Sequence, residues 1–159
     1  MKRIVTIAAV VVAGGLWALS ASLAHEGQVM HLPDGKDVIA LRHYLMENVG
    51  DNAKELDKKL KAGDIAAAKV NAQAIALHST RVPELFPQGS TSATSRAKDE
   101  IWQKWDEFVK AAEAMKTESD QLTVTIAGGK AAEAATQAKK MFGACKSCHD
   151  GFRKPEEKK

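Results

Sequence analysis

The sequence predicts an all-α protein folded as an antiparallel four-helix bundle. Three observations support this prediction. Only 5% of the 159 residues are aromatic and alanine is abundant, which favours helices because strands are enriched in β-branched and aromatic residues. Apolar residues recur at three- and four-residue steps along four stretches of the chain. Short glycine-containing links join the first stretch to the second and the third to the fourth, which suits antiparallel neighbours.

Charge and cysteine content exclude several classes of protein. The 23 basic and 20 acidic residues nearly balance, so the chain lacks the basic excess typical of nucleic-acid-binding proteins. Two cysteines cannot form a dense disulfide framework. The length suits one domain, and the charged and hydrophobic fractions of 27% and 45% are those of an ordinary globular protein.

Residues 1–24 are expected to be a signal peptide. Lys2 and Arg3 precede an apolar run over residues 4–19, and the small residues Ser22 and Ala24 stand at the −3 and −1 positions of a cleavage site. An uncleaved membrane anchor is the alternative, but the run is shorter than the ~20 residues that a spanning helix needs. The sequence therefore predicts an exported protein without a membrane segment after cleavage.

An irregular lead-in over residues 25–35 is expected before a four-helix domain over residues 36–154. The first helix should run from about Asp37 to Ala62 and end at Gly63, since glycine often follows a helix. Its apolar face consists of Val38, Leu45, Val49, Ala53, Leu56 and Leu60. Asp64 can cap a second helix that continues to about Arg81, with Ile65, Ala68, Ala72 and Ile75 on one face. A long loop over residues 83–97 follows.

The third helix is expected from about Lys98 to Ile126, before Gly128 and Gly129. Its heptad stripe is unbroken and includes Ile101, Trp105, Phe108, Ala112, Met115, Ser119, Leu122 and Ile126, so Trp105 and Phe108 are predicted to be core residues. The fourth helix should run from Lys130 to about Arg153, and residues 155–159 form a charged, frayed tail. One face of the fourth helix carries mostly small side chains, namely Ala134, Ala138, Met141, Cys145, Cys148 and Phe152. A packed core needs more bulk there, unless another group fills the space.

Near the end of this helix, Cys145, Cys148 and His149 form a C-x-x-C-H motif. In an exported protein this motif indicates covalent attachment of one c-type haem. Each thiol would form a thioether with one vinyl group, and the adjacent imidazole would bind the iron. A disulfide between cysteines this close would close only a small loop, a thioredoxin-like pair needs a βαβ context, and a zinc site usually needs four ligands. The haem would fill the space beside the small-residue face.

The sequence resembles the cytochrome c-prime / cytochrome c556 family of periplasmic four-helix cytochromes. The segment over residues 143–154 is close to the family's typical ending, and Arg42 followed four residues later by Met46 matches its first helix. The stretches 83–86 and 100–102 resemble two further family landmarks. The resemblance covers essentially the whole mature chain and implies a four-helix bundle enclosing one haem.

The resemblance also implies two possible states of the iron. In c556-type members a methionine at the position of Met46 binds the iron opposite the motif histidine, which suits electron transfer. In many c-prime members a non-ligand residue stands there, and the open iron position binds NO or CO. We expect Met46 to be the sixth ligand, since His/Met ligation raises the reduction potential. A flexible core methionine is the alternative.

Two further residues are expected at the haem. The resemblance makes Arg42 a partner of a haem propionate, and Trp102 is expected to pack near the haem or to donate its indole N–H to a propionate. Arg42 could instead be an ordinary surface residue. Other candidates are weaker, and each has a more ordinary explanation as an exposed, mobile or packing residue: His25, His31, His43, His78, Met30, Met115 and Met141.

The sequence therefore predicts a periplasmic electron carrier that is not an enzyme. The alternative is a five-coordinate protein that binds NO or CO, and a haem-free bundle with an incidental motif is a third. Expected partners are periplasmic redox proteins, and a homodimer is possible. The end of the fourth helix is basic, which complements a helix C-terminus and could also favour an acidic redox partner: Lys139, Lys140, Lys146, Arg153 and Lys154.

Overall fold

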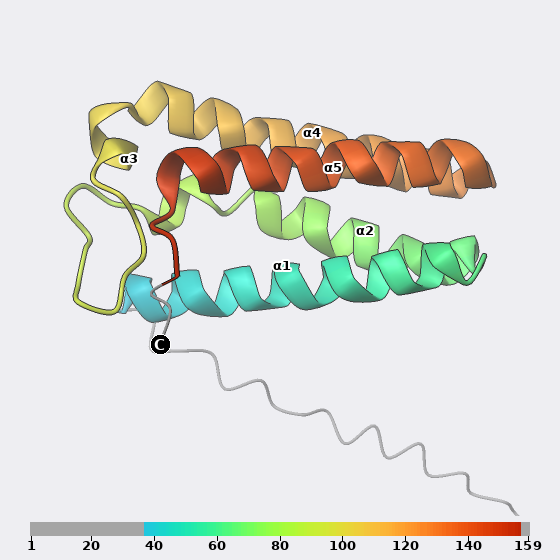
Figure 1. Ribbon diagram of the computed structural model, residues 1–159, viewed down its shortest axis with the longest axis horizontal. Helices are drawn as coiled ribbons and strands as arrows, with labels where there is room; N and C mark the ends of the chain where they lie inside the picture. The colour runs from blue at the N-terminus through green and yellow to red at the C-terminus, as the bar shows by residue number, and fades with distance from the viewer. Residues whose placement is uncertain (1–36, 157–159) are drawn as a thin grey trace, which may run out of the picture. The chain divides into compact units, whose positions relative to one another are not determined.

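The computed structural model describes residues 37–156, so the expected signal peptide, the lead-in over residues 25–35 and the last three residues lie outside it. The described part of the chain is helical, with no strand apart from an isolated bridge between Ala97 and Arg153. In chain order the elements are α1 (Val38–Lys61), α2 (Ile65–Ser79), the short 3-10 helix η1 (Pro83–Leu85), α3 (Glu100–Gln103), α4 (Trp105–Ala127) and α5 (Ala131–Phe152). Figure 1 labels the α-helices.

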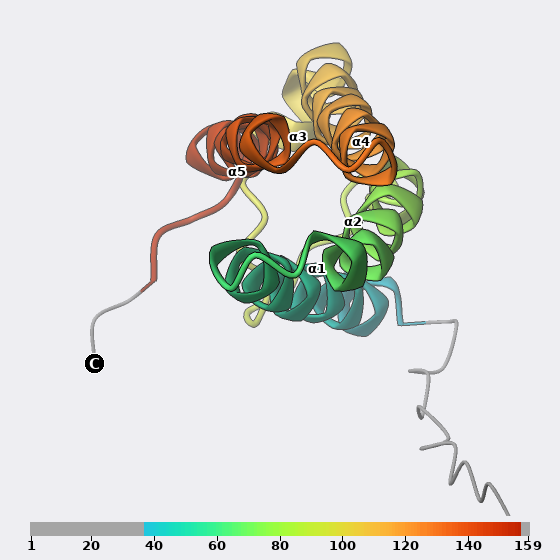
Figure 2. The same ribbon diagram turned by 90° about the vertical axis from the view of Figure 1, so that its right-hand side faces the viewer.

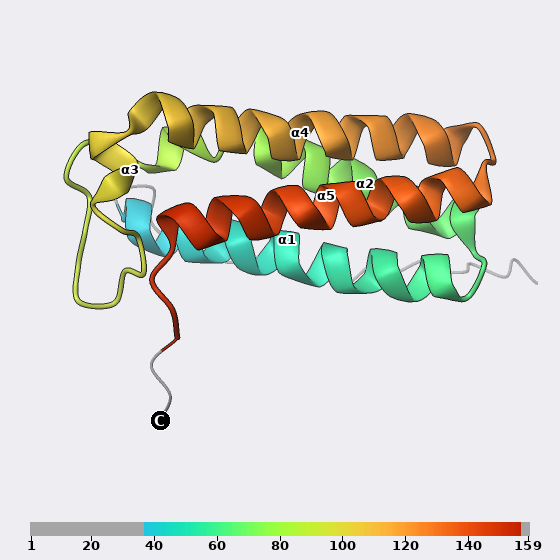
Figure 3. The ribbon, with the colours of Figure 1, turned by 45° about the horizontal axis from the view of Figure 1, so that its top comes forward.

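The four long helices form the predicted bundle. Helix α1 packs on α2, α2 on α4 and α4 on α5, whereas α1 and α5 contact each other much less. The end-on view in Figure 2 shows the four helices arranged in this order around the bundle axis. Figure 3 shows α4, α5 and α1 running nearly alongside one another, with the long α2–α3 connection at one end. The prediction of an all-α four-helix bundle is confirmed.

Helix ends follow the predicted residues. The side chain of Asp37 accepts hydrogen bonds from the backbone N–H groups of Ile39 and Ala40, both at 3.0 Å, and so caps α1. Asp64 caps α2 by accepting from the N–H of Ala67 at 3.1 Å. Gly63 and Gly129 have φ angles of 77° and 69°, a left-handed conformation in which a side chain would be strained.

The apolar stripes predicted from the sequence supply most of the core. Buried residues include Leu45, Val49, Leu56, Ala68, Ala72, Ile75, Ile101, Phe108, Ala112, Met115, Leu122, Ile126, Ala134, Ala138 and Met141. Val38, Ala53, Leu60 and Ile65 are only partly buried. Cys145, Cys148 and Phe152 are also partly buried, so the apolar face of α5 is less covered towards its C-terminal end.

One predicted element was wrong, because the third helix is not continuous. Lys104 has φ −124° and ψ 48°, and this non-helical residue separates α3 from α4. The interruption falls directly before Trp105, the first residue of α4, whereas the heptad positions beyond it stay buried. Trp105, predicted to be in the core, is 38% exposed, whereas Phe108 is buried as predicted.

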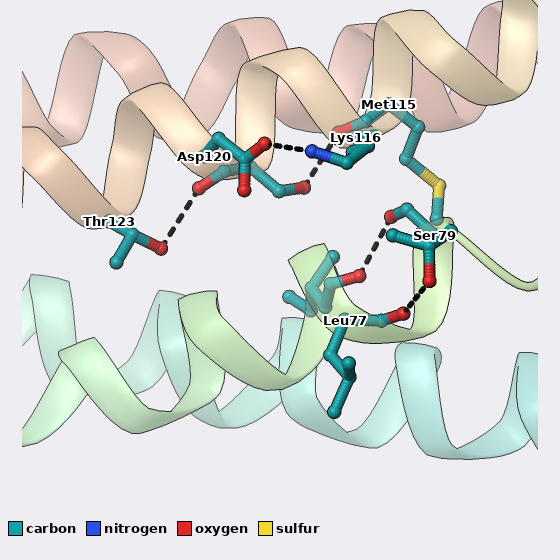
Figure 4. Close-up of polar contacts among 9 residues, drawn as sticks. Leu77, Ser79, Met115, Lys116, Asp120 and Thr123 are labelled. Atoms are coloured by element: carbon teal, nitrogen blue, oxygen red, sulfur yellow. Dashed lines mark hydrogen bonds and ion pairs between the residues drawn. The ribbon is translucent and has the colours of Figure 1, made fainter.

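Two buried serines lie on α2 and α4. The hydroxyl of Ser79 donates to the carbonyl of Ile75, and that of Ser119 donates to the carbonyl of Met115, each at 2.7 Å. Ser79 and Met115 are labelled in Figure 4. Bonding back to the carbonyl four residues earlier satisfies both hydroxyls without a partner from another helix. The two helices can therefore pack closely at these small side chains.

None of the helices in residues 37–156 combines the length and apolar character needed to cross a bilayer.

Candidate functional site

A cavity of about 750 Å³ lies where α1 and α5 make little contact. Its walls come from three long helices and from the α2–α3 connection. Helix α1 contributes Met46 and Val49 among others, α4 contributes Phe108, Ala111, Ala112 and Met115, and α5 contributes Phe142, Cys145, Cys148, His149 and Phe152. Of the α5 face that the sequence predicted to border a space, only the C-terminal part does so, with Cys145, Cys148 and Phe152. Ala134, Ala138 and Met141 are instead buried in the core.

The structure brings the three residues of the C-x-x-C-H motif to this one cavity. Cys145 and Cys148 are three residues apart on α5, close to one helical turn, and both are free, half-buried thiols. His149 follows directly and is also half-buried. Two thiols and an imidazole thus border the same cavity from one helix.

Burial sets the electrostatics of these groups. Burial raises the pKa of the Cys145 thiol. Burial also raises the pKa of Cys148, to about 11; the neighbouring Cys145 adds to this rise and Arg153 opposes it. Burial, with Arg153 and Arg96 nearby, lowers the pKa of His149, and Asp150 opposes that shift. The imidazole is therefore neutral at pH 7, and its ring nitrogen is free to act as a metal ligand.

Helix α1 places Met46 on the same cavity as the motif. The methionine is half-buried and packs against the core, and His43, one turn earlier, is exposed at the cavity edge. A second methionine, Met115, lines the cavity from α4 and is 7% exposed. The sequence indicated only a packing role for Met115, because its heptad position does not show that part of the α4 face borders a cavity.

Arg42 borders the cavity and is 4% exposed, with its hydrogen bonds directed to the α2–α3 connection. Its Nε donates to the carbonyl of Leu85 at 2.8 Å, and Nη1 and Nη2 both donate to the carbonyl of Ser90 at 3.0 Å. Nη2 also donates to the hydroxyl of Ser90 at 2.6 Å. Among the described residues no carboxylate lies within ion-pair distance of this guanidinium. Its charge can therefore still attract an anionic group in the cavity, and the propionate role stays a prediction.

Trp102 differs from expectation. It is not among the residues that line the cavity, and its indole Nε1–H donates to the carbonyls of Phe86 and Pro87 at 3.1 and 2.9 Å. The indole therefore holds the α2–α3 connection against α3. The sequence placed Trp102 near the haem because the conformation of that connection was not predictable.

Arg96 is a residue of the site that the sequence interpretation missed. It borders the cavity, and its Nε and Nη2 donate to the carbonyl of Lys154 at 3.1 and 2.9 Å, while Nη1 pairs with Glu156 at 2.7 Å. The loop around Arg96 has no periodicity, so no sequence signal connects it to a residue 58 positions later.

The donor set fits a covalently bound haem. Thioether formation needs two free thiols about one helical turn apart, and iron ligation needs a neutral imidazole beside them; α5 supplies all three at a mainly apolar cavity. Met46 offers a thioether from α1 on the same cavity.

Comparison with known proteins gives consistent results. A sequence profile of the family described as Cytochrome C' matches residues 37–153. A cytochrome c' of Rhodopseudomonas palustris is 32% identical over 165 residues, which covers 95% of this chain and 95% of that protein. A cytochrome c-556 of Agrobacterium fabrum is 28% identical over 115 residues, covering 70% of this chain and 77% of that protein.

Solved structures show the same fold. One is a cytochrome c' described as having an unusual ligand-controlled dimer dissociation. It superposes with a TM-score of 0.70 at 23% identity, covering 77% of this chain and 98% of that one.

Proposed function

Because the chain belongs to the cytochrome c' family, we propose that it is a one-electron carrier with iron bound by His149 and Met46. Proteins of this family carry one covalent c-type haem, and Cys145 and Cys148 are the only two cysteines of this chain. It is thus a c-type cytochrome, either an electron carrier or a gas-binding protein. The bound haem supplies reversible one-electron redox chemistry at its iron.

The observation that most supports the electron-carrier role is the placement of Met46. Its half-buried side chain borders the cavity from α1, while His149 borders it from α5. A thioether here would complete the ligand set, keep small gases from the iron and limit reorganisation on electron transfer. In this role the protein makes no bond in a substrate, so we propose that it is not an enzyme.

The protein's own residues would hold the haem in a fixed frame. The thiols of Cys145 and Cys148 would anchor it to α5, and the charge of Arg42 would attract a propionate carboxylate. Phe108, Phe142 and Phe152 would exclude water from the apolar part of the cavity.

The alternative is a gas-binding protein with an open iron position. This alternative is supported because the chain is similar to a protein named cytochrome c' as well as to one named cytochrome c-556. Spectroscopy of the purified holoprotein separates the two. Iron–thioether bonding gives a weak long-wavelength absorption band in the ferric protein and a low-spin state, whereas an open position gives a high-spin spectrum that changes when NO or CO is added.

We further propose that the protein works in the periplasm with redox partner proteins. The expected signal peptide supports export, and exposed lysines on α5, Lys139, Lys140 and Lys146, would complement an acidic partner. A homodimer is supported by the solved cytochrome c' described above and by Val70 and Leu77, which are 60% and 67% exposed on one side of α2. Light scattering of the holoprotein measures that assembly.

A further inference from the structure

Residues 80–99 form the α2–α3 connection, here called the crossing loop. One side chain of α1 binds this loop. The guanidinium of Arg42 donates to the carbonyls of Leu85 and Ser90, to the hydroxyl of Ser90 at 2.6 Å and to the hydroxyl of Ser95 at 3.5 Å. These contacts occupy donors on all three guanidinium nitrogens, and they join positions 43 to 53 residues apart in sequence. Arg42 thus fixes the crossing loop to α1.

The other end of the crossing loop is bound to the C-terminal end of α5. The N–H of Lys98 donates to the carbonyl of Phe152 at 3.0 Å, and the N–H of Lys154 donates to the carbonyl of Arg96 at 2.7 Å. The ammonium of Lys98 donates to two carbonyls in the last turn of α5, those of Asp150 at 2.9 Å and Gly151 at 3.1 Å. Cations are favourable at this end of a helix, because its last carbonyls lack helical partners.

The crossing loop is attached at Arg42 on α1 and at Arg153 beyond the end of α5, and each of these residues lies one turn from an expected iron ligand. Arg42 precedes Met46 by four residues on α1. Arg153 follows His149 by four residues, donates its N–H to the His149 carbonyl at 3.0 Å and bridges to Ala97 of the crossing loop. Helices α1 and α5 make few direct contacts. Apart from the packing of α1 on α2, α2 on α4 and α4 on α5, the crossing loop is therefore what connects the two helices at this end.

We propose that Arg42 is a positioning residue that, through the crossing loop, sets how closely Met46 of α1 approaches the iron held by His149 of α5. The inference rests on the proposed function for its effect on ligation. The link itself is a property of the described residues and can be tested separately.

The geometry requires arginine and not only a positive charge. A planar guanidinium reaches Leu85 and Ser90 together and lies over the Phe86 ring, with 4.1 Å between its central carbon and the ring centroid. A lysine ammonium at this position would keep the charge but could not make this forked set of bonds. The Arg42→Lys substitution therefore separates the positioning effect from attraction of a propionate.

The experiment compares holoprotein variants with the wild type. Arg42→Lys is the main variant, and Ser90→Ala removes the 2.6 Å hydroxyl contact more mildly, in case Arg42→Lys does not fold. Arg81→Lys is the matched control, because Arg81 is exposed and pairs only at the surface with Glu84 at 3.1 Å. Two quantities are measured, the iron–thioether absorption band and the hydrogen-exchange rates of the Lys98 and Lys154 amides.

We expect Arg42→Lys to weaken or abolish the thioether band with haem retained, and to make the two amides exchange about tenfold faster. Ser90→Ala should act in the same direction to a smaller extent, and Arg81→Lys should change neither quantity. An unchanged band and unchanged amides in Arg42→Lys would overturn the inference while leaving the proposed function intact. If the wild type lacks the band, the proposed function fails, and the amide exchange rates alone test the link between Arg42 and α5. Faster exchange in Arg42→Lys would then support that link, and unchanged exchange would overturn it.

Discussion

The rings of Phe108 and Phe152 meet edge to face, with their centroids 5.3 Å apart and their planes at 81°. Phe108 is also in edge contact with Phe86, with centroids 4.8 Å apart. This row of three rings connects the crossing loop, α4 and the last turn of α5. It runs beside the cavity, which all three rings help to line.

Replacing Phe108 with alanine should be strongly destabilising. The side chain is 2% exposed and contacts three other rings, those of Phe86, Trp105 and Phe152, so Phe108→Ala should lower the free energy of unfolding by about 3–5 kcal/mol. Urea unfolding of the holoprotein, followed by circular dichroism, measures the change. Val124→Ala is the control on the same helix, because Val124 is 72% exposed and should cost far less. Equal losses for the two variants would contradict the burial described for α4.

Met46→Ala should convert the iron from six- to five-coordinate if the proposed function is right. The variant should lose the thioether absorption band, become high-spin and bind CO in the ferrous state. Met115→Ala tests the second methionine of the cavity. It should retain the band and lose stability only, because Met115 is assigned a packing role. Loss of the band in Met115→Ala, with Met46→Ala unchanged, would transfer the ligand role to α4.

Covalent attachment should depend on both thiols of α5. Mass spectrometry of the exported wild-type protein should show one haem, and a variant with Cys145→Ala and Cys148→Ala together should show none. Ser147→Ala serves as the control, because Ser147 lies between them, is exposed and supplies no expected bond. A haem adduct in the double variant would place the attachment elsewhere in the chain.

The haem-free chain should be less stable than the holoprotein. Without the cofactor, the apolar lining of the 750 Å³ cavity lacks packing partners between α1 and α5. Each kcal/mol lost should lower the melting temperature by roughly 2 to 8 °C for a domain of this size. Thermal unfolding of the double cysteine variant, compared with the wild type, gives this difference. Equal melting temperatures would show that haem does not contribute to bundle packing.

The N-terminal cap of α2 offers a test away from the cavity. Asp64→Ala removes the acceptor for the N–H of Ala67 and should cost about 1 kcal/mol. The absorption spectrum of the haem should not change. Asp51→Ala is the comparison, since Asp51 forms an exposed ion pair with Lys54 and should cost less.

Periodicity explains why much of the bundle could be predicted. The residues from Phe108 to Ile126 keep one phase along α4, so their burial followed from three- and four-residue spacing. The burial predicted for Trp105 was wrong, because Trp105 directly follows Lys104, whose backbone leaves the helical region. Nothing in the local sequence, such as a proline or glycine, indicates a break there.

Part of the candidate site could likewise be predicted from residue spacing, and part of it could not. The positions of Cys145, Cys148 and His149 followed from their spacing on one helix. The contacts of Arg42 with Leu85 and Ser90 and of Trp102 with Pro87 did not, because each depends on the path of an irregular loop. Hydrogen bonds between residues tens of positions apart leave no periodic signal in one sequence.

The closest helix pairs of the bundle, α1 with α2, α2 with α4 and α4 with α5, are successive long helices along the chain. Contacts of this kind cost little loop-closure entropy and favour rapid folding. Only the junction of α1 with α5 must bring the two ends of the domain together, and the cavity lies at that junction. The prosthetic group would therefore link the first long helix to the last, where neighbouring long helices make the fewest direct contacts.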